Sequence, residues 1–306
     1  MSARWKGVFP AVTTKFKDDF SIDYKAMERH IDGQIQAGVH GIVTTGTLGE
    51  NASLSAKEKQ EVLKIAVSVS AGRVPVLAGV AENTTAGACE VVTDATANGA
   101  DGFMLLPAMM YPADRRETLE HFRTVGRMSE LPIMIYNNPV VYKVDVTPEM
   151  FGELAEIESF VALKESSDDP RRITDIYNEV GDRYQIFTGV DNLALESLML
   201  GAVGWVAGLV VAFPRETVAI YDLARAGRYA EALVIYRWFM PMLHLDVSTK
   251  LVQNIKLAEV LAGVGTETVR PPRLSLVGEE RAHVIRVVES ALANRPALPE
   301  LSGQLS

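Results

Sequence analysis

The feature that most constrains the fold of this chain is a series of eight short apolar segments that recur between residues 8 and 209. They span residues 8–13, 41–45, 75–80, 102–106, 132–136, 160–164, 184–188 and 204–209. Most are nearly continuous hydrophobic runs, without the alternation of polar and apolar residues that a half-exposed strand shows. Continuous apolar strands are typical of a parallel sheet that is covered on both faces. We therefore expect eight buried parallel strands.

Helices are expected between these strands, because the amphipathic stretches there begin with residues that favour a helix start. These residues are Ser55, Thr84, Asp191 and the pair Thr147-Pro148. Eight strand–helix units fit within residues 8–227, which is the span of a TIM barrel, whereas a doubly wound open sheet uses fewer strands. The sequence therefore predicts an α/β protein with a (β/α)₈ TIM barrel.

Three similar joints support a regular barrel. Residues 37–41, 98–102 and 200–204 each carry one glycine at the expected end of a helix and a second glycine at the start of the next strand. Glycine ends a helix in the left-handed conformation and lets a strand begin sharply. The repetition of this joint indicates that the strand–helix unit itself repeats.

The strand pattern stops at Arg228, and the rest of the chain favours helices. The helical stretches span residues 229–244, 249–262 and 279–294. Pro271-Pro272 breaks the chain between the last two. We expect a barrel at residues 1–227 and a C-terminal helical extension at residues 228–306, whose apolar faces cover the barrel or a subunit contact.

The composition agrees with a folded protein of enzyme size. Of the 306 residues, 48% are hydrophobic and 23% are charged, which is sufficient for a substantial core. The net charge of −9 and pI ≈ 5.2 leave no excess of basic residues, so a nucleic acid is not an expected partner. No apolar stretch reaches the ~18 residues of a spanning helix. We expect a cytoplasmic protein without a membrane partner.

The cysteine and histidine content argues against a metal centre. Cys89 is the only cysteine, so an intrachain disulfide or a cysteine metal cage cannot form. The histidines lack ligand spacing and are His30, His40, His121, His244 and His283. We expect neither a metal nor another cofactor.

The residue with the clearest chemical signal is Lys164, because it ends an otherwise apolar strand. In a TIM barrel the reacting groups lie at the carboxyl ends of the strands. Burial there favours the neutral amine, which is the nucleophile that a Schiff base needs. The alternatives are a lysine that reaches solvent and a lysine that pairs with Glu165.

Tyr136 ends the preceding strand, so its phenol is expected beside Lys164 if both side chains point inward. A phenol in this place can carry a proton to and from a carbinolamine. The alternative is a buried tyrosine whose hydroxyl binds the backbone.

A third candidate is the loop after the second strand, where Gly46 and Gly49 flank Thr47. Glycines at this spacing let backbone amides converge on an anion, and the threonine hydroxyl adds a donor. Such a loop suits a carboxylate; the alternative is an ordinary turn.

Together, three motifs in order resemble those of the dihydrodipicolinate synthase / N-acetylneuraminate lyase superfamily. The motifs are Gly46-Thr47-Leu48-Gly49-Glu50, Tyr136-Asn137-Asn138-Pro139 and Leu163-Lys164-Glu165-Ser166. The resemblance covers nearly the whole chain, and three ordered motifs are much more specific than any one of them. It implies a lyase that acts through a lysine Schiff base, without a cofactor, on a small 2-oxo acid or cyclic imino acid.

The resemblance also implies residue roles. Lys164 would form the Schiff base and Tyr136 would relay protons, while Thr47 with the amides around Leu48 and Gly49 would hold the substrate carboxylate. The other implied pocket residues are Thr188 and Gly189 at the rim and Val206, whose backbone lines the pocket. The family commonly forms homotetramers built as dimers of dimers.

Three departures from the synthase pattern bear on the substrate. Leu48 replaces the second threonine of the loop, and Met109 stands where a tyrosine would reach the neighbouring subunit's site. Val141 replaces an arginine that grips the second substrate's carboxylate, a charge-assisted contact of roughly 1.5–3 kcal/mol. A synthase that condenses pyruvate with aspartate semialdehyde is therefore disfavoured. Whether a neighbouring chain completes the site stays open.

Residues 107–111 and 245–250 resemble the branch that deaminates 1-pyrroline-4-hydroxy-2-carboxylate to 2,5-dioxopentanoate and ammonia in hydroxyproline degradation. We therefore expect this deaminase activity. The alternatives are the synthase, an aldolase or dehydratase of a 2-keto-3-deoxy sugar acid, a phosphate-binding barrel that uses Gly189 and residues 204–208, and a binding barrel without turnover.

Overall fold

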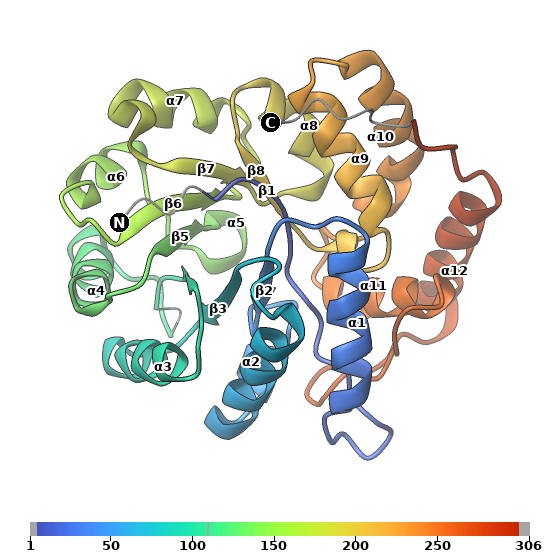
Figure 1. The fold of residues 1–306 in the computed structure, drawn as a ribbon, viewed down its shortest axis with the longest axis horizontal. Helices are drawn as coiled ribbons and strands as arrows, with labels where there is room; N and C mark the ends of the chain where they lie inside the picture. The colour runs from blue at the N-terminus through green and yellow to red at the C-terminus, as the bar shows by residue number, and fades with distance from the viewer. Residues whose placement is uncertain (1–4, 109, 300–306) are drawn as a thin grey trace.

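The computed structural model describes residues 5–108 and 110–299. In this part of the chain, eight parallel strands form one sheet in the order β1-β8-β7-β6-β5-β4-β3-β2. A bridge between Ala11 and Val43, and a 2.9 Å hydrogen bond from Val12 N to Val43 O, return β1 to the side of β2. The sheet is a nearly closed barrel with helices around it (Figure 1). The predicted (β/α)₈ TIM barrel is confirmed.

Each predicted apolar segment overlaps one strand, and the boundaries differ by one to a few residues. The strands are β1 (Gly7–Pro10), β2 (Ile42–Thr44), β3 (Val76–Val80), β4 (Gly102–Leu105), β5 (Ile133–Asn137), β6 (Phe160–Glu165), β7 (Gln185–Thr188) and β8 (Gly204–Ala207). Nearly all of their residues are buried, because the barrel interior covers one face of the sheet and the helices cover the other. This burial explains the continuous apolar runs.

Two aromatic rings fill the amino-terminal end of the barrel interior. The rings of Phe9 and Phe187 contact each other edge to face, with 5.2 Å between centroids. Gly41 and Gly204 make room for them, because a Cβ atom at either position would lie within 2.3 Å of a ring atom. The amino end is therefore packed, and the carboxyl end remains for a site.

Helices connect the strands as the sequence predicts. They are α1 (Tyr24–Gln36), α2 (Ala56–Ser70), α3 (Thr85–Ala97), α4 (Arg115–Met128), α5 (Pro139–Tyr142), α6 (Pro148–Leu154), α7 (Arg171–Val180), α8 (Ala194–Met199) and α9 (Pro214–Arg225). The Ser55 hydroxyl caps α2 by accepting a 3.3 Å hydrogen bond from Glu58 N. The Thr84 hydroxyl caps α3 in the same way, by accepting a 3.1 Å hydrogen bond from Gly87 N. Thr147 directly precedes α6.

The three glycine joints have the predicted conformation. Gly38, Gly99 and Gly201 end their helices at φ +94°, +85° and +109°. A residue with a side chain is strained in this region of φ. The joints therefore depend on glycine, and each leads directly into a strand.

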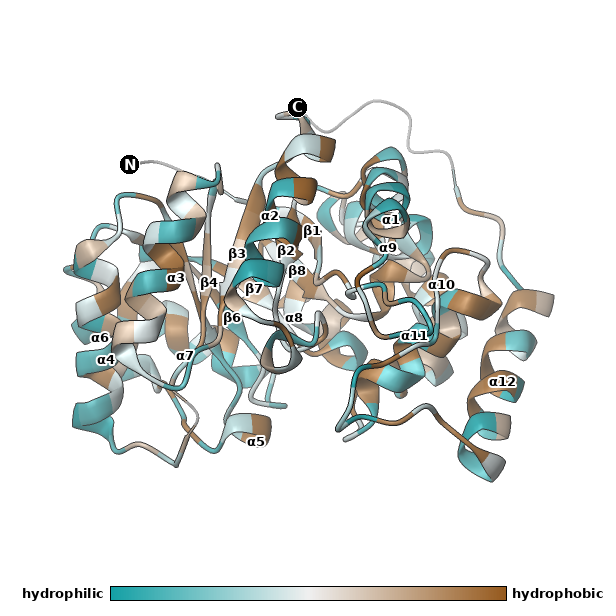
Figure 2. Ribbon diagram, turned by 90° about the horizontal axis from the view of Figure 1, so that it is seen from below, coloured by the Kyte–Doolittle hydropathy of each residue, from teal (hydrophilic) through white to brown (hydrophobic). Residues whose placement is uncertain are grey.

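The C-terminal extension consists of α10 (Tyr229–Leu243), α11 (Leu251–Leu261) and α12 (Gly278–Ala293), which lie together on one flank of the barrel (Figure 2). The α10 helix packs on α9, where Phe213 contacts Phe239 with 5.6 Å between ring centroids. The α12 helix is tied to α10 by a 2.9 Å hydrogen bond from Trp238 Nε1 to Ala291 O. The division of the chain at residue 227 stays a prediction.

Candidate active site

Lys164 lies at the carboxyl end of β6, with 7% of its surface exposed. Its Nζ atom lies 4.1 Å from the centroid of the Tyr136 ring. Burial lowers the pKa of the Lys164 amine below its ordinary value. The phenol of Tyr142 and the carboxyls of Asp246 and Asp191 act in the opposite direction. The amine is thus sheltered from water and close to a phenol.

Glu165 does not pair with Lys164, in contrast to one of the alternatives. Its carboxylate accepts hydrogen bonds from Asn137 Nδ2 at 3.0 Å and from Ser167 N at 2.7 Å. Alternate residues of a strand point to opposite faces of the sheet, so the two side chains diverge. The Lys164 side chain is the one that points into the barrel.

Tyr136 lies beside Lys164, as predicted, because the two residues are register partners of β5 and β6. The Tyr136 hydroxyl accepts a 3.0 Å hydrogen bond from Asn138 Nδ2, not from the backbone. Burial raises the pKa of the Tyr136 phenol. The phenol therefore stays protonated and can donate.

A second tyrosine joins these groups. The hydroxyl oxygen of Tyr142, at the end of α5, lies 2.6 Å from Thr47 Oγ1. Its ring contacts the Tyr136 ring edge to face, with 5.6 Å between centroids and 89° between planes. Thr47 of the loop after β2, Tyr142 of α5, Tyr136 of β5 and Lys164 of β6 thus form a continuous set of contacts.

The loop after β2 presents free backbone donors. Among the described residues, no hydrogen bond uses the amides of Leu48 and Gly49. The carbonyl groups of the loop fix its conformation, because Thr14 Oγ1 donates to Gly49 O at 2.6 Å and Asn51 N donates to Gly46 O at 3.2 Å. This arrangement suits the predicted carboxylate site.

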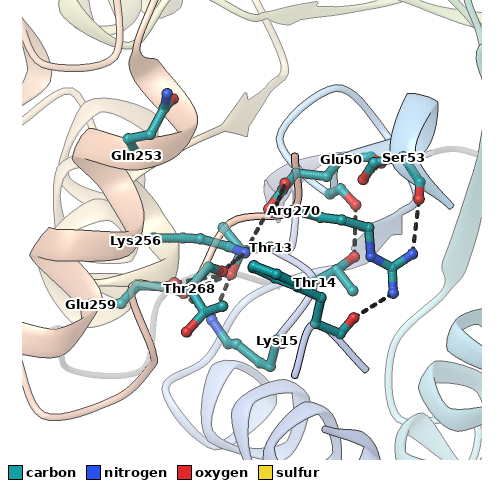
Figure 3. A network of polar contacts seen from close by, with 12 residues as sticks. Thr13, Thr14, Lys15, Glu50, Ser53, Gln253, Lys256, Glu259, Thr268 and Arg270 are labelled. Carbon is teal, nitrogen blue, oxygen red and sulfur yellow. Dashed lines mark hydrogen bonds and ion pairs between the residues drawn. The ribbon is translucent and has the colours of Figure 1, made fainter. Parts of the chain in front are cut away.

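Two strained residues bracket this loop. Thr45 and Glu50 have φ of +51° and +57°, a region that costs a residue with a side chain of order 1–3 kcal/mol unless its surroundings hold it. The Glu50 carboxylate is held by Lys256 Nζ at 2.6 Å and by Arg270 N at 3.0 Å. Figure 3 shows Lys256 pointing from α11 toward Glu50. The C-terminal extension therefore fixes the loop.

A second buried ion pair lies next to the first (Figure 3). Lys15, after β1, pairs with Glu259 of α11, and both side chains are fully buried. Glu259 also accepts a 2.9 Å hydrogen bond from Thr13 Oγ1. The α11 helix thus contacts the segments that follow β1 and β2, at the barrel end that carries the site.

Two carboxyls, those of Asp191 and Asp246, lie close enough to Lys164 to act on its charge. As predicted, a helix starts at Asp191, because the 3₁₀ turn at Asp191–Leu193 continues directly into α8. The Asp191 carboxylate accepts 2.9 Å hydrogen bonds from Trp205 Nε1 and Leu209 N. Burial raises the pKa of Asp191 above its ordinary value, and these donors act in the opposite direction.

The Asp246 carboxyl lies against Gly208, where a Cβ atom would be 2.6 Å from Asp246 Oδ1. No hydrogen bond between described residues involves this carboxyl. Burial and then the Asp191 charge raise the pKa of Asp246 well above its ordinary value.

Of the remaining predicted residues, Gly189 lies against Lys164. A Cβ atom at Gly189 would lie 2.4 Å from Lys164 Cε and 2.1 Å from Ser166 Oγ, so the glycine leaves room for the lysine stem. Thr188 is buried in β7. Val206 is buried in β8, beside Phe9 of β1. Met109 lies outside the described residues.

The phosphate-binding alternative is not supported, because the glycine amides that it would use already donate to other groups. The Gly208 amide donates to Asp191 Oδ2 at 3.2 Å, and the Gly189 amide donates to Glu165 O at 2.9 Å. Gly204 begins β8 and so lies at the opposite end of the barrel. A phosphate would therefore find neither of these two amides free.

Sequence analysis alone missed Tyr142, Asp191 and Asp246 as parts of this site. Tyr142 follows the Tyr136 motif closely, and that proximity was the available signal. Asp246 lies after α10, in the 245–250 segment noted for its family resemblance, but it belongs to no strand end, so its place beside Lys164 was not expected.

A hollow of about 440 Å³ lies elsewhere, lined by Ser159 and Glu158 before β6 and by Arg127 of α4. Its place at the amino end of β6 separates it from the reacting groups of a TIM barrel. Within residues 5–108 and 110–299, no group of three or more His, Cys, Asp or Glu side chains could hold a metal ion. In the same residues, no helix has the length and apolar character needed to cross a bilayer.

Comparison with known proteins places this geometry in a family. The sequence profile described as the dihydrodipicolinate synthetase family matches residues 4–291. A 4-hydroxy-tetrahydrodipicolinate synthase of Methanothrix thermoacetophila is 32% identical over 279 residues, which cover 91% of this chain and 94% of the relative. An uncharacterized DapA-like lyase of Rhizobium meliloti is 32% identical over 289 residues, which cover 92% of this chain and 96% of the relative.

The fold has a solved counterpart of the same size. The crystal structure of dihydrodipicolinate synthase from Aquifex aeolicus matches with a TM-score of 0.89 and 29% identity. The match covers 97% of this chain and all of that structure. The similarity therefore includes the C-terminal helices as well as the barrel.

Proposed function

This chain belongs to the dihydrodipicolinate synthetase family, and on that premise we propose that it is a lyase whose Lys164 forms a Schiff base with a pyruvate-type 2-oxo acid. The observation that carries the proposal is the buried Lys164 amine beside the Tyr136 ring, at the carboxyl end of a barrel strand. Burial favours the neutral amine, which is the reactive form.

In the proposed reaction, the Lys164 amine attacks C2 of the oxo acid, and the oxo oxygen takes up a proton to give a carbinolamine. Protonation of the new hydroxyl then releases water, and the C–N double bond of the iminium forms. Tyr136 supplies and recovers the proton. Thr47 and the amides of Leu48 and Gly49 hold the substrate carboxylate.

For the second half of the reaction, the names of the relatives favour the synthase, which joins pyruvate to an aldehyde. Our expectation of a deaminase rested on short segments, and these relatives give it no support. One observation keeps it as a second candidate. Val141 is exposed at the place of the expected arginine, so this position offers no guanidinium to a second substrate carboxylate.

Reductive trapping tests the covalent step. The protein is incubated with pyruvate and borohydride, and its intact mass and peptides are measured. We expect one added pyruvate-derived group per chain, on Lys164, and none in Lys164→Ala. An adduct on another lysine, or no adduct, contradicts the proposal.

Turnover assays with different substrates separate the candidate reactions. Pyruvate with aspartate semialdehyde is compared with 1-pyrroline-4-hydroxy-2-carboxylate and with a 2-keto-3-deoxy sugar acid. Ammonia release identifies the deaminase, consumption of the aldehyde identifies the synthase, and release of pyruvate or of water identifies the aldolase or the dehydratase. Lys164→Ala is the control for each.

A further inference from the structure

The contacts of Tyr142 indicate how the active site is completed. We propose that Tyr142 supplies a second phenol to the Lys164 site of its own chain, where it links Tyr136 to Thr47 as a proton relay, so that no tyrosine from another chain is needed. The inference rests on the proposed function and adds a proton-transfer residue to it.

The first support is the hydrogen bond to the loop. The 2.6 Å distance between Tyr142 Oη and Thr47 Oγ1 is short for two hydroxyl groups. Either oxygen can donate, so a proton can pass in both directions. Thr47 belongs to the loop whose free amides suit the carboxylate, so Tyr142 connects the proton path to the substrate.

The second support is the contact with Tyr136. The two rings meet at 89°, with 5.6 Å between centroids, and the Tyr136 ring in turn lies 4.1 Å from Lys164 Nζ. Tyr142 also lies close enough to Lys164 for the two to interact electrostatically. Both phenols therefore belong to one site.

The local sequence explains why Tyr142 reaches this place. Asn138 caps the single turn of α5, because its Oδ1 accepts a 3.0 Å hydrogen bond from Val141 N. Its Nδ2 donates to Tyr136 Oη at 3.0 Å. One amide side chain thus fixes both Tyr136 and the turn that carries Tyr142. Lys143, at φ +60°, ends the turn immediately after it.

The contrast with Tyr111 supports the assignment. Tyr111 is the described tyrosine nearest to Met109, but it is 56% exposed, and the acidic Glu117 is its main partner. Tyr142, by contrast, is directed at Thr47. Tyr111 is therefore a matched control: a tyrosine close to the expected position but outside the relay.

The test uses a partial reaction that needs only pyruvate. When the Lys164 iminium loses a C3 proton to form an enamine, D₂O returns a deuteron, and NMR follows the exchange of the pyruvate methyl group. We expect Tyr142→Phe to slow the exchange by about 100-fold, within the range for a lost proton-transfer group. Its melting temperature and the KM for pyruvate should stay close to the original values.

The control variant Tyr111→Phe should exchange at the original rate. Borohydride trapping of pyruvate by Tyr142→Phe shows that the altered site is folded. A rate within twofold of the original in Tyr142→Phe overturns the inference. If the unaltered protein forms no pyruvate adduct, the proposed function itself fails, so the two failures are distinguishable.

Subunit mixing tests whether the phenol acts within its own chain. Lys164→Ala and Tyr142→Phe chains with different tags are co-expressed, purified through both tags and assayed. We expect no more exchange activity than the two variants show separately, since every site then lacks one group. Restored activity in the hybrids shows that the phenol comes from a neighbouring chain and overturns the inference. A monomer that forms no hybrids supports the inference.

Discussion

At the end of β6, Lys164 is subject to two opposing influences. Burial lowers the pKa of its amine, while Tyr142, Asp246 and Asp191 raise it. The neutral fraction, which attacks the substrate, depends on their balance. Asp246 is the carboxyl in this set without a hydrogen-bond donor among the described residues, so its charge is the easiest to change without breaking other contacts.

The first prediction concerns this balance. In Asp246→Asn, Lys164 loses a group that raises its pKa, so a larger fraction of the amine is neutral at a given pH. The acid limb of the pH profile for pyruvate methyl exchange should therefore move to lower pH. An unchanged limb, or one that moves to higher pH, contradicts the electrostatic argument.

The second prediction concerns the space beside the lysine. Gly189→Ala places a Cβ atom 2.4 Å from Lys164 Cε, so the lysine stem must move. We expect a large loss of pyruvate trapping, because a misplaced nucleophile loses its orientation. Gly33→Ala is the control, since it lies in α1 with nothing within 4 Å of the new atom; it should trap pyruvate normally. Equal trapping by both variants contradicts the prediction.

At the scale of elements, α11 supports the substrate loop through charges that are fully buried. Lys256 and Glu50 both have side chains with no exposed surface. Removing one partner of a buried pair leaves an uncompensated charge, whereas replacing both partners is often tolerated. The pair therefore links the stability of the extension to the position of the loop.

The third prediction follows. Lys256→Met should lower the free energy of unfolding by about 3–5 kcal/mol and raise the KM for pyruvate, because Glu50 loses its cation and the loop relaxes. The double variant Lys256→Met with Glu50→Gln should recover most of the stability. Denaturant unfolding and exchange kinetics measure both. If Lys256→Met is as stable as the original protein, the ion pair does not contribute to stability and the prediction is wrong.

At the scale of the whole molecule, the barrel and the C-terminal helices are joined by buried polar contacts and by apolar packing. The α10 helix covers Phe213 beside α9, and α11 supplies the cation for Glu50. The homotetramer implied by the family resemblance is a proposal, which light scattering with size-exclusion chromatography measures.

The fourth prediction concerns the expected division at residue 227. A chain that ends there loses the cation of Glu50 and exposes the apolar face of α9, so we expect it not to unfold cooperatively on its own. Near-ultraviolet circular dichroism and thermal melting of the fragment test this. A fragment with a sharp melting transition shows that the barrel folds independently of the extension.

The sequence by itself determined the barrel, because strands buried on both faces must be apolar along their length, and this property is local. It also determined that Tyr136 and Lys164 lie side by side, since adjacent parallel strands align their ends. Only the tertiary structure decided the rest. Tyr142 meets Thr47 across 95 residues, and Lys256 meets Glu50 across 206. Such contacts depend on loop conformation and helix packing, which have no periodic signal in the sequence.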